Sequence, residues 1–389
     1  MIEIENKIKS ERKKLGITLL ELSEELGFPN YQTLSSIEKG KRPIKVSELN
    51  KIAKVLGVTV GYLLGEEELS KNKVLWRKCT DETECSKLEN KFKTFCNNFK
   101  KLSQLIDHKY EKFAPPSLQE LQKEIYENDF EFAKNIAENY VLRLNLGKYP
   151  GNNLTFALQE KNILIFCEDL GSFGSSASLV GDFGAVILLN KKDIQWRRTF
   201  DIAHELFHLL TWNVYPSEEV YDDEGSGKSN SEKYADAFAT SLLLPEKSLL
   251  DEIKKREGEK DLDLIDIIDI ASKFKVSIQA LMWRLQNLLT FSGIWKHLKE
   301  KIWGNLNMEE IRNHPGMEKL NKLLRSKQVD IHRLPEIYVT QALKTFTHGR
   351  ISKLKLAEYL DVEYGDMASF LSDYSYPDIE EFNLASFSP

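Results

Sequence analysis

The sequence has few cysteines, glycines and prolines and no long apolar run, and each shortage excludes a class of protein. Four cysteines in 389 residues are too few for a disulfide framework, so reduced thiols are expected. Twenty glycines and 11 prolines are too few for a collagen-like or low-complexity chain. No apolar run approaches the roughly 20 residues that cross a bilayer, and residues 1–15 alternate charges where a signal peptide needs an apolar stretch. We therefore expect a folded cytoplasmic protein with no membrane contact.

The net charge of −6 is unevenly distributed along the chain. Residues 1–65 contain 11 Lys and Arg against 8 Asp and Glu, a balance of +3. Residues 70–113 contain 11 against 6, a balance of +5, so the remainder of the chain is distinctly acidic. Any contact with a polyanion is therefore expected in the first third of the chain.

The first 65 residues have the apolar spacing of five short helices. These helices are expected at 8–15, 19–26, 31–38, 46–56 and 59–64. A glycine follows each of the first four runs, where a helix commonly ends in a left-handed residue. The four glycines are Gly16, Gly27, Gly40 and Gly57. The pattern predicts a compact, all-helical module.

Strand patterns are confined to the centre of the chain. The runs 162–167 and 185–190 are short and aliphatic or β-branched, which is typical of buried strands. The Gly- and Ser-rich segment 171–184 between them is expected to be a loop or a weak edge strand. Helical spacing returns at 193–212 and 231–243 and continues almost everywhere beyond. The fold class is therefore mainly α with an α+β centre.

The pentapeptide from His204 to His208 combines two histidines and a glutamate at helical spacing. Positions i and i+4 of a helix lie about 40° apart on one face, so both imidazoles can bind one metal ion. Glu205 lies beside the pair, where it can accept a proton from water activated by that ion. The alternative is two surface histidines on an amphipathic helix.

A catalytic zinc ion takes three protein ligands and leaves one position for water, so a third ligand is needed. The next predicted helix offers Glu232 and, one turn later, Asp236. Asp236 could accept the second imidazole N–H of a histidine ligand and fix its tautomer. Ala235 and Ala239 keep this helix slim enough to approach the first. Carboxylate pairs at this spacing are also common on exposed helices, so a solvated face is the alternative.

Other candidate ligands are less favoured by their setting. The acidic segment 218–224 ends in Gly225-Ser-Gly227, and such a loop fixes metal geometry poorly. We expect a solvated surface or a flap that faces the substrate. Several other histidines lie far along the chain and are expected at the surface or at helix ends. They are His297, His314, His332 and His348.

Ordered blocks around these residues resemble the ImmA/IrrE family of metallopeptidases. The blocks are GAVILLN (184–190), RRTFDIAHELFHLL (197–210), EKYADAFA (232–239) and LLLP (242–245). The resemblance covers about residues 130–290 and implies a gluzincin-like site. In that site the two histidines of the pentapeptide and Glu232 bind Zn²⁺, and Glu205 is the catalytic base. Phe207 stands where the family usually has Gly, and Asp236 stands where Asn is frequent.

Residues 18–42 have the layout of a helix-turn-helix, with small hydrogen-bonding side chains on the exposed side of the second helix. The candidate base contacts are Gln32, Thr33, Ser35 and Ser36, and the candidate phosphate contacts are Lys39, Lys41 and Arg42. A helical protein-interaction module is the alternative. The segments LSSIEKGKRP (34–43) and LNKIAKVLGV (49–58) resemble the Xre, or Cro/C1-type, repressor domain. That resemblance implies binding to double-stranded DNA.

The length of the chain allows two or three domains with connecting segments. We expect a helix-turn-helix domain at 1–65, a basic helical linker at 66–116, a zincin-like metallopeptidase domain at 117–250, a helix-turn-helix-like helical segment at 251–290 and a helical C-terminal region at 291–389. Packing or self-association as a homodimer is the role expected of the last two segments.

These features together predict a DNA-binding, zinc-dependent endopeptidase. The family resemblance implies that its substrate is a repressor-like regulatory protein, cleaved in response to a stress or phage signal. Segment 175–186 could pair with an extended substrate as an added strand. Tyr215 and Tyr221 are among several candidates for stabilising the oxyanion. The alternative is a non-catalytic transcriptional regulator whose zinc site senses metal or is structural.

Overall fold

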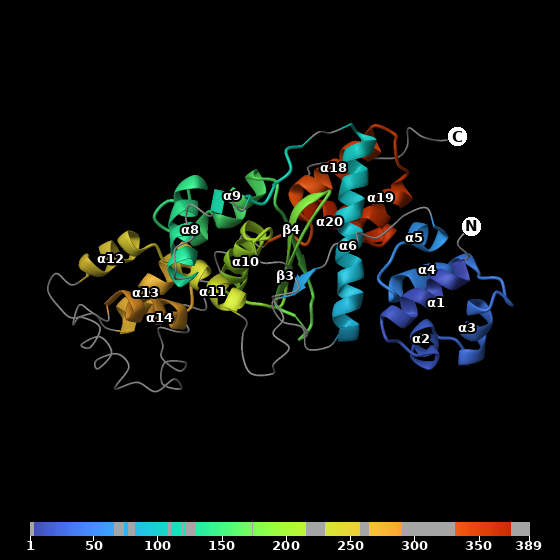
Figure 1. Ribbon diagram of the computed structural model, residues 1–389. Coiled ribbons are helices and arrows are strands. Elements are labelled where there is room, and N and C mark those ends of the chain that lie inside the picture. The colour runs from blue at the N-terminus through green and yellow to red at the C-terminus, as the bar shows by residue number, and fades with distance from the viewer. Residues whose placement is uncertain are drawn as a thin grey trace.

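The computed structural model is mainly helical, with one small sheet at its centre (Figure 1). It describes residues 4–65, 74–76, 82–107, 110–117, 120–121, 129–172, 174–214, 230–256, 264–289 and 331–374. No helix within these ranges is long and apolar enough to cross a membrane. In Figure 1 the N-terminal helices lie to the right, the sheet lies in the middle, and further helical layers follow to the left.

The N-terminal domain contains the five helices that the apolar spacing predicts. They are α1 (Ile4–Lys14), α2 (Leu19–Leu26), α3 (Tyr31–Glu38), α4 (Val46–Val55) and α5 (Val60–Leu64). Thr18 begins α2 with a capping box, because its hydroxyl accepts the Glu21 N–H and the Glu21 carboxylate accepts the Thr18 N–H. The four glycines predicted to end helices all have left-handed backbones, with φ between 67° and 70°.

A buried ion pair joins α1 to α3 inside this domain. Arg12 donates through Nε and Nη2 to the two carboxylate oxygens of Glu38, at 2.6 and 2.9 Å. Its Nη1 also donates to the carbonyl oxygen of Ile17 at 2.8 Å. Both charged groups are therefore hydrogen-bonded, which buried charges require.

The central sheet has four strands in the order β1-β3-β4-β2. They are β1 (Leu75–Trp76), β2 (Leu164–Glu168), β3 (Ser176–Gly181) and β4 (Gly184–Asn190). Strands β2 and β4 are parallel, β3 is antiparallel to β4, and β1 is antiparallel to β3. The two predicted strands are confirmed as β2 and β4. The Gly- and Ser-rich segment between them contains β3. This strand is paired on both sides at the two residues that pair with β1, and on one side elsewhere.

One face of the sheet is covered by helices from distant parts of the sequence. They are α6 (Glu82–Leu105), α18 (Glu336–Thr347), α19 (Lys353–Leu360) and α20 (Met367–Asp373). Aromatic side chains form this interface: Phe95 stacks on Phe166 of β2 at 5.3 Å, and Tyr338 meets both rings edge-on. The segment predicted as a linker, 66–116, therefore supplies a strand and a core helix of the central domain. The described part of the C-terminal region, 331–374, is helical as predicted.

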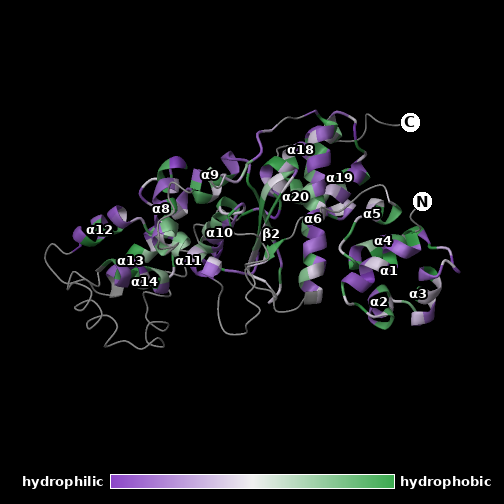
Figure 2. Cartoon of the chain, viewed as in Figure 1, coloured by the Kyte–Doolittle hydropathy of each residue, from purple (hydrophilic) through white to green (hydrophobic). Residues whose placement is uncertain are grey.

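The other face of the sheet packs against α10 (Gln195–Leu210), which is followed by α11 (Asn230–Leu243). Around these two lie α8 (Asp129–Arg143), η1 (Pro150–Asn152), α9 (Leu154–Glu160), α12 (Glu246–Lys254), α13 (Leu264–Phe274) and α14 (Ile278–Leu289). Nearly every residue of β4 and of the second half of α10 is buried. The strands are correspondingly apolar in Figure 2, as expected for a sheet covered on both faces.

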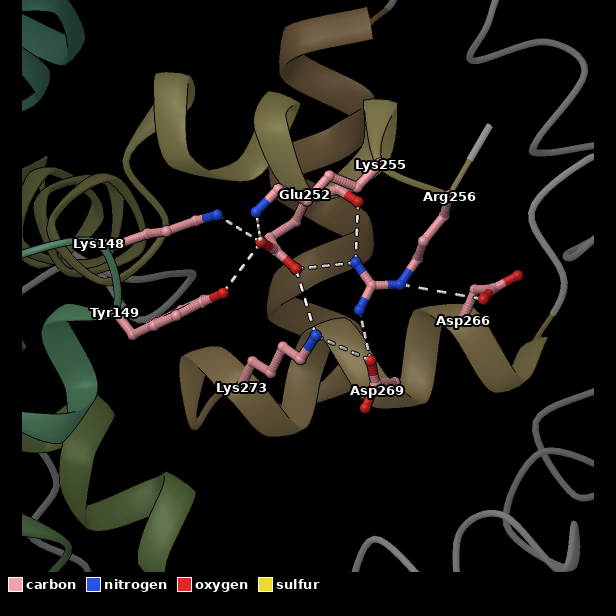
Figure 3. A network of polar contacts seen from close by, with 8 residues as sticks. All are labelled: Lys148, Tyr149, Glu252, Lys255, Arg256, Asp266, Asp269 and Lys273. Carbon is pink, nitrogen blue, oxygen red and sulfur yellow. Dashed lines mark hydrogen bonds and ion pairs between the residues drawn. The ribbon is translucent and has the colours of Figure 1, made fainter. Parts of the chain in front are cut away.

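A charged network fastens the outer helices α12 and α13 to the loop before η1 (Figure 3). Its centre is the Glu252 carboxylate, which is almost fully buried. Burial favours the neutral acid, but hydrogen bonds from Lys148, Arg256, Tyr149 and Lys255 outweigh it and hold the pKa of Glu252 below its ordinary value. Lys273 also pairs with Glu252 at 3.4 Å. Glu252 is therefore ionised and fully paired.

Three of the four cysteines lie in the described ranges. Cys96 on α6 and Cys167 on β2 are buried free thiols, as predicted. Cys85, near the start of α6, is instead disulfide-bonded, so the expectation of a reduced thiol is wrong at this position.

Candidate metal centre

The pentapeptide from His204 to His208 lies on α10, the helix between the sheet and α11. Both histidines and Glu205 are buried, with at most 4% of each residue exposed. Surface histidines on an amphipathic helix would be solvated, so that alternative is wrong. Glu232 on α11 is also buried, at 8% exposure, which excludes a solvated face for this carboxylate.

Three side-chain groups from these two helices converge on one point. His204 Nε2 and His208 Nε2 lie 3.2 Å apart. Glu232 Oε2 lies 3.3 Å from His204 Nε2, and Glu232 Oε1 lies 3.1 Å from His208 Nε2. Neighbouring ligand atoms of a tetrahedral zinc ion lie about 3.3–3.6 Å apart, given bonds of about 2.0–2.2 Å. The spacing is therefore close to that of three ligands around one ion. In the described part of the chain, these three residues form the one group of His, Cys, Asp or Glu with such geometry.

Asp236 fixes the orientation of one imidazole. Its Oδ1 lies 2.9 Å from His204 Nδ1. A carboxylate only accepts hydrogen bonds, so we assign the proton to Nδ1, which leaves a lone pair on His204 Nε2. That lone pair points into the cluster. The structure thus brings Asp236 to the position that the helical spacing predicts.

We test whether a cation fits this cluster by comparing its hydrogen-bond donors with its acceptors. Without a cation, acceptor atoms face each other and outnumber the donors. Burial favours neutral Glu232, but hydrogen bonds and charge interactions with protonated imidazoles of His204 and His208 hold the pKa of Glu232 below its ordinary value, and a metal cation in place of those protons would act in the same direction. An ionised carboxylate and an imidazole lone pair at 3.3 Å repel each other unless a cation lies between them. The donor set of two nitrogens and one oxygen suits Zn²⁺.

Glu205 lies next to the cluster on the side of the sheet. Its Oε1 accepts a hydrogen bond from Ser176 Oγ of β3 at 2.7 Å. Its Oε2 is buried and has no hydrogen-bond partner among the described residues. Buried carboxylate oxygens normally have partners, so this oxygen is available for a proton from a bound water molecule.

Family models match two parts of the chain. Residues 8–63 match the model described as Helix-turn-helix, and residues 158–286 match the model described as IrrE N-terminal-like domain. The chain joins these two domains. Comparison with curated proteins and with solved structures gives no match. All residues of the candidate metal centre lie in the second matched range.

Ser176 is the residue of this site that the sequence does not reveal. It belongs to a Gly- and Ser-rich segment expected to be a loop or a weak edge strand, and it reaches Glu205 only because β3 packs against α10. Phe207, which replaces the usual glycine of the ImmA/IrrE family, is fully buried and packs on Phe238 of α11 at 5.5 Å. It therefore fills the interface between the two helices that hold the cluster.

The expectation that segment 175–186 is exposed and could accept an added strand is wrong at several positions, because Val186 lies in β4 between β2 and β3 and two residues of β3 pair with β1. Leu75 pairs with Ser178, and Trp76 pairs with Ala177. These two residues of β1 occupy the outer hydrogen-bonding edge of β3.

The remaining sequence candidates take no part in the cluster or lie outside the described residues. Tyr215, Tyr221, the acidic segment 218–224 and two of the distant histidines, His297 and His314, lie outside. Of the other two, His332 stacks on Tyr374 at 4.3 Å, and His348 is the C-cap residue of α18.

The helix-turn-helix domain presents several of the predicted DNA contacts on its surface. Gln32, Lys39 and Lys41 are exposed, and Thr33, Ser35 and Ser36 are half-buried along α3. Arg42 is also half-buried and donates two hydrogen bonds to Glu48 of α4, at 2.8 and 3.2 Å. Arg42 therefore also ties the loop after α3 to α4.

Proposed function

We propose that the chain is a DNA-binding, zinc-dependent endopeptidase that cleaves a repressor-like regulatory protein. The observation that carries this proposal is the convergence of His204, His208 and Glu232, beside a Glu205 oxygen that has no hydrogen-bond partner in the described part of the chain. The match of residues 158–286 to a peptidase family supports the same conclusion.

The proposed metal ligands are the two imidazole Nε2 atoms and the Glu232 carboxylate. When bound there, Zn²⁺ supplies Lewis acidity and lowers the pKa of its water ligand toward about 7. Glu205 Oε2 accepts the proton of the attacking water and passes it to the leaving amine. Ser176 holds the other oxygen of Glu205, which fixes the direction of Oε2. Asp236 keeps the proton of His204 on Nδ1, so that Nε2 remains a donor to the metal.

A catalytic zinc site is favoured over a structural one by the number and type of ligands. Structural zinc sites are normally closed by four protein ligands and are rich in Cys. In the described ranges, the cluster has three candidate ligands and no cysteine. Glu205 lies beside the cluster as a candidate general base, and a structural zinc site needs no such base. A non-catalytic metal sensor is the alternative that the experiment below separates.

The DNA-binding part of the proposal rests on the helix-turn-helix domain. Residues Gln32, Thr33, Ser35 and Ser36 of α3 are proposed to face base edges, and Lys39, Lys41 and Arg42 to contact phosphates. The basic balance of residues 1–65 and 70–113 favours approach to a polyanion. Binding should therefore weaken steeply as salt concentration rises.

The test is co-expression of the full chain with repressor-like proteins encoded beside it, followed by detection of a shortened product. Wild type should yield the product, and Glu205→Gln should abolish it while zinc content stays at one ion per chain. Lys233→Gln, an exposed change on α11, serves as the control with normal cleavage. Cleavage by Glu205→Gln at the wild-type rate would show that the base is wrongly assigned. Full zinc content without cleavage by any form would favour the metal sensor.

A further inference from the structure

We propose that an extended polypeptide substrate docks on the outer edge of β3, beside the candidate metal centre, and that β1 of the same chain occupies this edge. Residues Val74–Trp76 would then compete with substrate and keep the peptidase at low activity until they are displaced. This inference rests on the proposed function for its effect on cleavage. The occupancy of the edge can be tested without it.

The two faces of β3 look in different directions. Ser176 donates to Glu205, so this side chain and Ser178, two residues on, face α10 and the metal centre. Ala177 and Leu179 point the other way and belong to the hydrophobic cluster with α6. In an antiparallel pair, residues directly opposite each other project to the same face. Leu75, opposite Ser178, therefore lies on the face of the metal centre.

The direction of β1 leads toward Glu205. Leu75 pairs with Ser178 and Trp76 with Ala177, so the chain runs along β3 toward Ser176. An extended substrate that adds to β3 beside Glu205 must use the same outward N–H and C=O groups. One edge accepts one strand, so β1 and such a substrate exclude each other.

The pairing between β1 and β3 is short, so another extended strand can replace β1. Only two residues of β1 join the ladder. Trp76 Nε1 and Ser178 Oγ are both buried, and neither has a hydrogen-bond partner in the described ranges. Burying an unpaired polar group is unfavourable, so the ordered edge is held mainly by the apolar contacts of Val74, Leu75 and Trp76, each at most 7% exposed.

The helix-turn-helix domain is attached to the helix that follows β1. Asn90 Nδ2 of α6 donates to the carbonyl oxygen of Leu56 at 3.2 Å, and Lys87 pairs with Glu25 at 3.2 Å. Strand β1 thus lies in the chain between α5 and the helix on which the N-terminal domain docks (Figure 1). A ligand that moves this domain, such as DNA, would therefore act on α6, the next described element after β1.

The test compares Leu75→Asp with Leu142→Asp in the full zinc-loaded chain. Leu75 is 4% exposed on the face of the metal centre, so a carboxylate there should expel β1. Leu142 is 78% exposed on α8, so the same substitution there should change nothing. Hydrogen exchange of the amides of β3 that face β1 and not β4 is expected to accelerate at least tenfold in Leu75→Asp alone. Leu75→Asn is the milder variant should the first fail to fold.

A synthetic peptide with the sequence of residues 72–78 provides the second arm. It should restore slow exchange to Leu75→Asp, and a scrambled peptide should not. Cleavage of unfolded casein should be at least tenfold faster in Leu75→Asp than in wild type and should fall when the peptide is added. Unchanged exchange of β3 in a folded variant, or no protection by the peptide, would overturn the inference.

The cleavage result separates this inference from the proposed function. Faster exchange and protection by the peptide, with no cleavage by any form, would support occupancy of the edge and contradict the peptidase. Cleavage by wild type and Leu75→Asp at equal rates would support the peptidase and overturn competition by β1.

Discussion

At the scale of single residues, the site depends on side chains that orient other side chains. Asp236 and Ser176 touch no proposed ligand atom, yet each holds one polar group of the site in place. Removal of such a partner changes metal affinity or rate without unfolding the chain. Two variants test these two roles separately.

Asp236→Ala should weaken zinc binding by about 10–100-fold, because His204 loses the acceptor that fixes its tautomer and ring orientation. Competition with a chromophoric chelator measures the affinity. Lys233→Ala, three residues earlier on the same helix, is the control and should bind zinc as wild type does. Equal affinity of wild type and Asp236→Ala would contradict the assigned role.

Ser176→Ala should lower kcat by about tenfold and leave KM and zinc content nearly unchanged, because Glu205 loses the hydrogen bond that directs Oε2. Steady-state kinetics on a cleaved substrate measures this split. Ser176→Thr keeps the hydroxyl and should restore much of the rate. A variant that loses zinc instead would show that Ser176 supports the fold of the metal centre.

Much of the site could be predicted from the sequence because its spacing is local. His204, Glu205 and His208 follow from one helical turn, and Glu232 with Asp236 follows from another. Ser176 could not be predicted, since its contact with Glu205 spans 29 positions and depends on how β3 packs on α10. Local periodicity carries no information on such a contact.

At the scale of elements, buried ion pairs connect neighbouring helices. In the helix-turn-helix domain, Arg12 and Glu38 join α1 to α3, and hydrogen bonding to Glu38 raises the pKa of Arg12. Near the end of α12, Glu252 forms ion pairs with Lys148 and Arg256. The pair between Arg12 and Glu38 is costly to break because one charge would remain buried alone.

Glu38→Ala should reduce the free energy of unfolding of the helix-turn-helix domain by about 3–5 kcal/mol, because the Arg12 charge would be left unpaired. Lys14→Ala removes an exposed partner of buried Glu11, which keeps its hydrogen bond from the Tyr62 hydroxyl, so this change should cost clearly less. Thermal or urea denaturation, followed by circular dichroism, compares the two. Equal stability of the variants would contradict a structural role for the buried pair.

The Glu252 network predicts a pH dependence of stability. The folded-state pKa of Glu252 lies below its ordinary value of 4.5, so the stabilisation is fully present above that pH and is lost as pH falls toward the folded-state pKa. Wild type should therefore lose stability below about pH 4.5 more steeply than Glu252→Gln. Urea denaturation across this range measures the difference. Parallel curves for the two proteins would contradict the assignment.

Two helices of the N-terminal domain could be predicted to the residue because they have side-chain caps at their starts and turns at their ends. Helices α2 and α3 begin and end at the residues predicted, between Thr18 or Asn30 caps and the following turns. Strand β3 had no such signal, since glycine and serine are weak strand formers. It forms because β4 and β1 pair with it.

At the scale of the whole molecule, the chain closes on itself through contacts between distant segments. Ser103 of α6 donates to Gln341 of α18 at 2.7 Å, across 238 positions. The segment predicted as a linker therefore belongs to the central core. Loop closure over such distances leaves no trace in local sequence, which is why the domain limits were the least predictable feature.

Gly57→Ala should loosen the docking of the helix-turn-helix domain on α6. A Cβ at Gly57 would lie 2.6 Å from the carbonyl oxygen of Lys87, so α6 must shift. Gly27→Ala is the matched control, because its φ of +70° equals that of Gly57 to within a degree and no atom lies within 4 Å of its Cβ. Hydrogen exchange near Lys87 should accelerate in Gly57→Ala only. The same exchange in both variants would contradict the docking contact.

The central claim is that α10 and α11 together bind one zinc ion through two imidazoles and one carboxylate, with a position left for water. X-ray absorption at the zinc edge of the full chain, loaded with one equivalent, tests it most directly. We predict a first shell of nitrogen and oxygen only, at about 2.0–2.2 Å, with the outer-shell signature of two imidazoles. A sulfur shell at about 2.3 Å, or imidazole scattering unaltered by His208→Ala, would contradict the account.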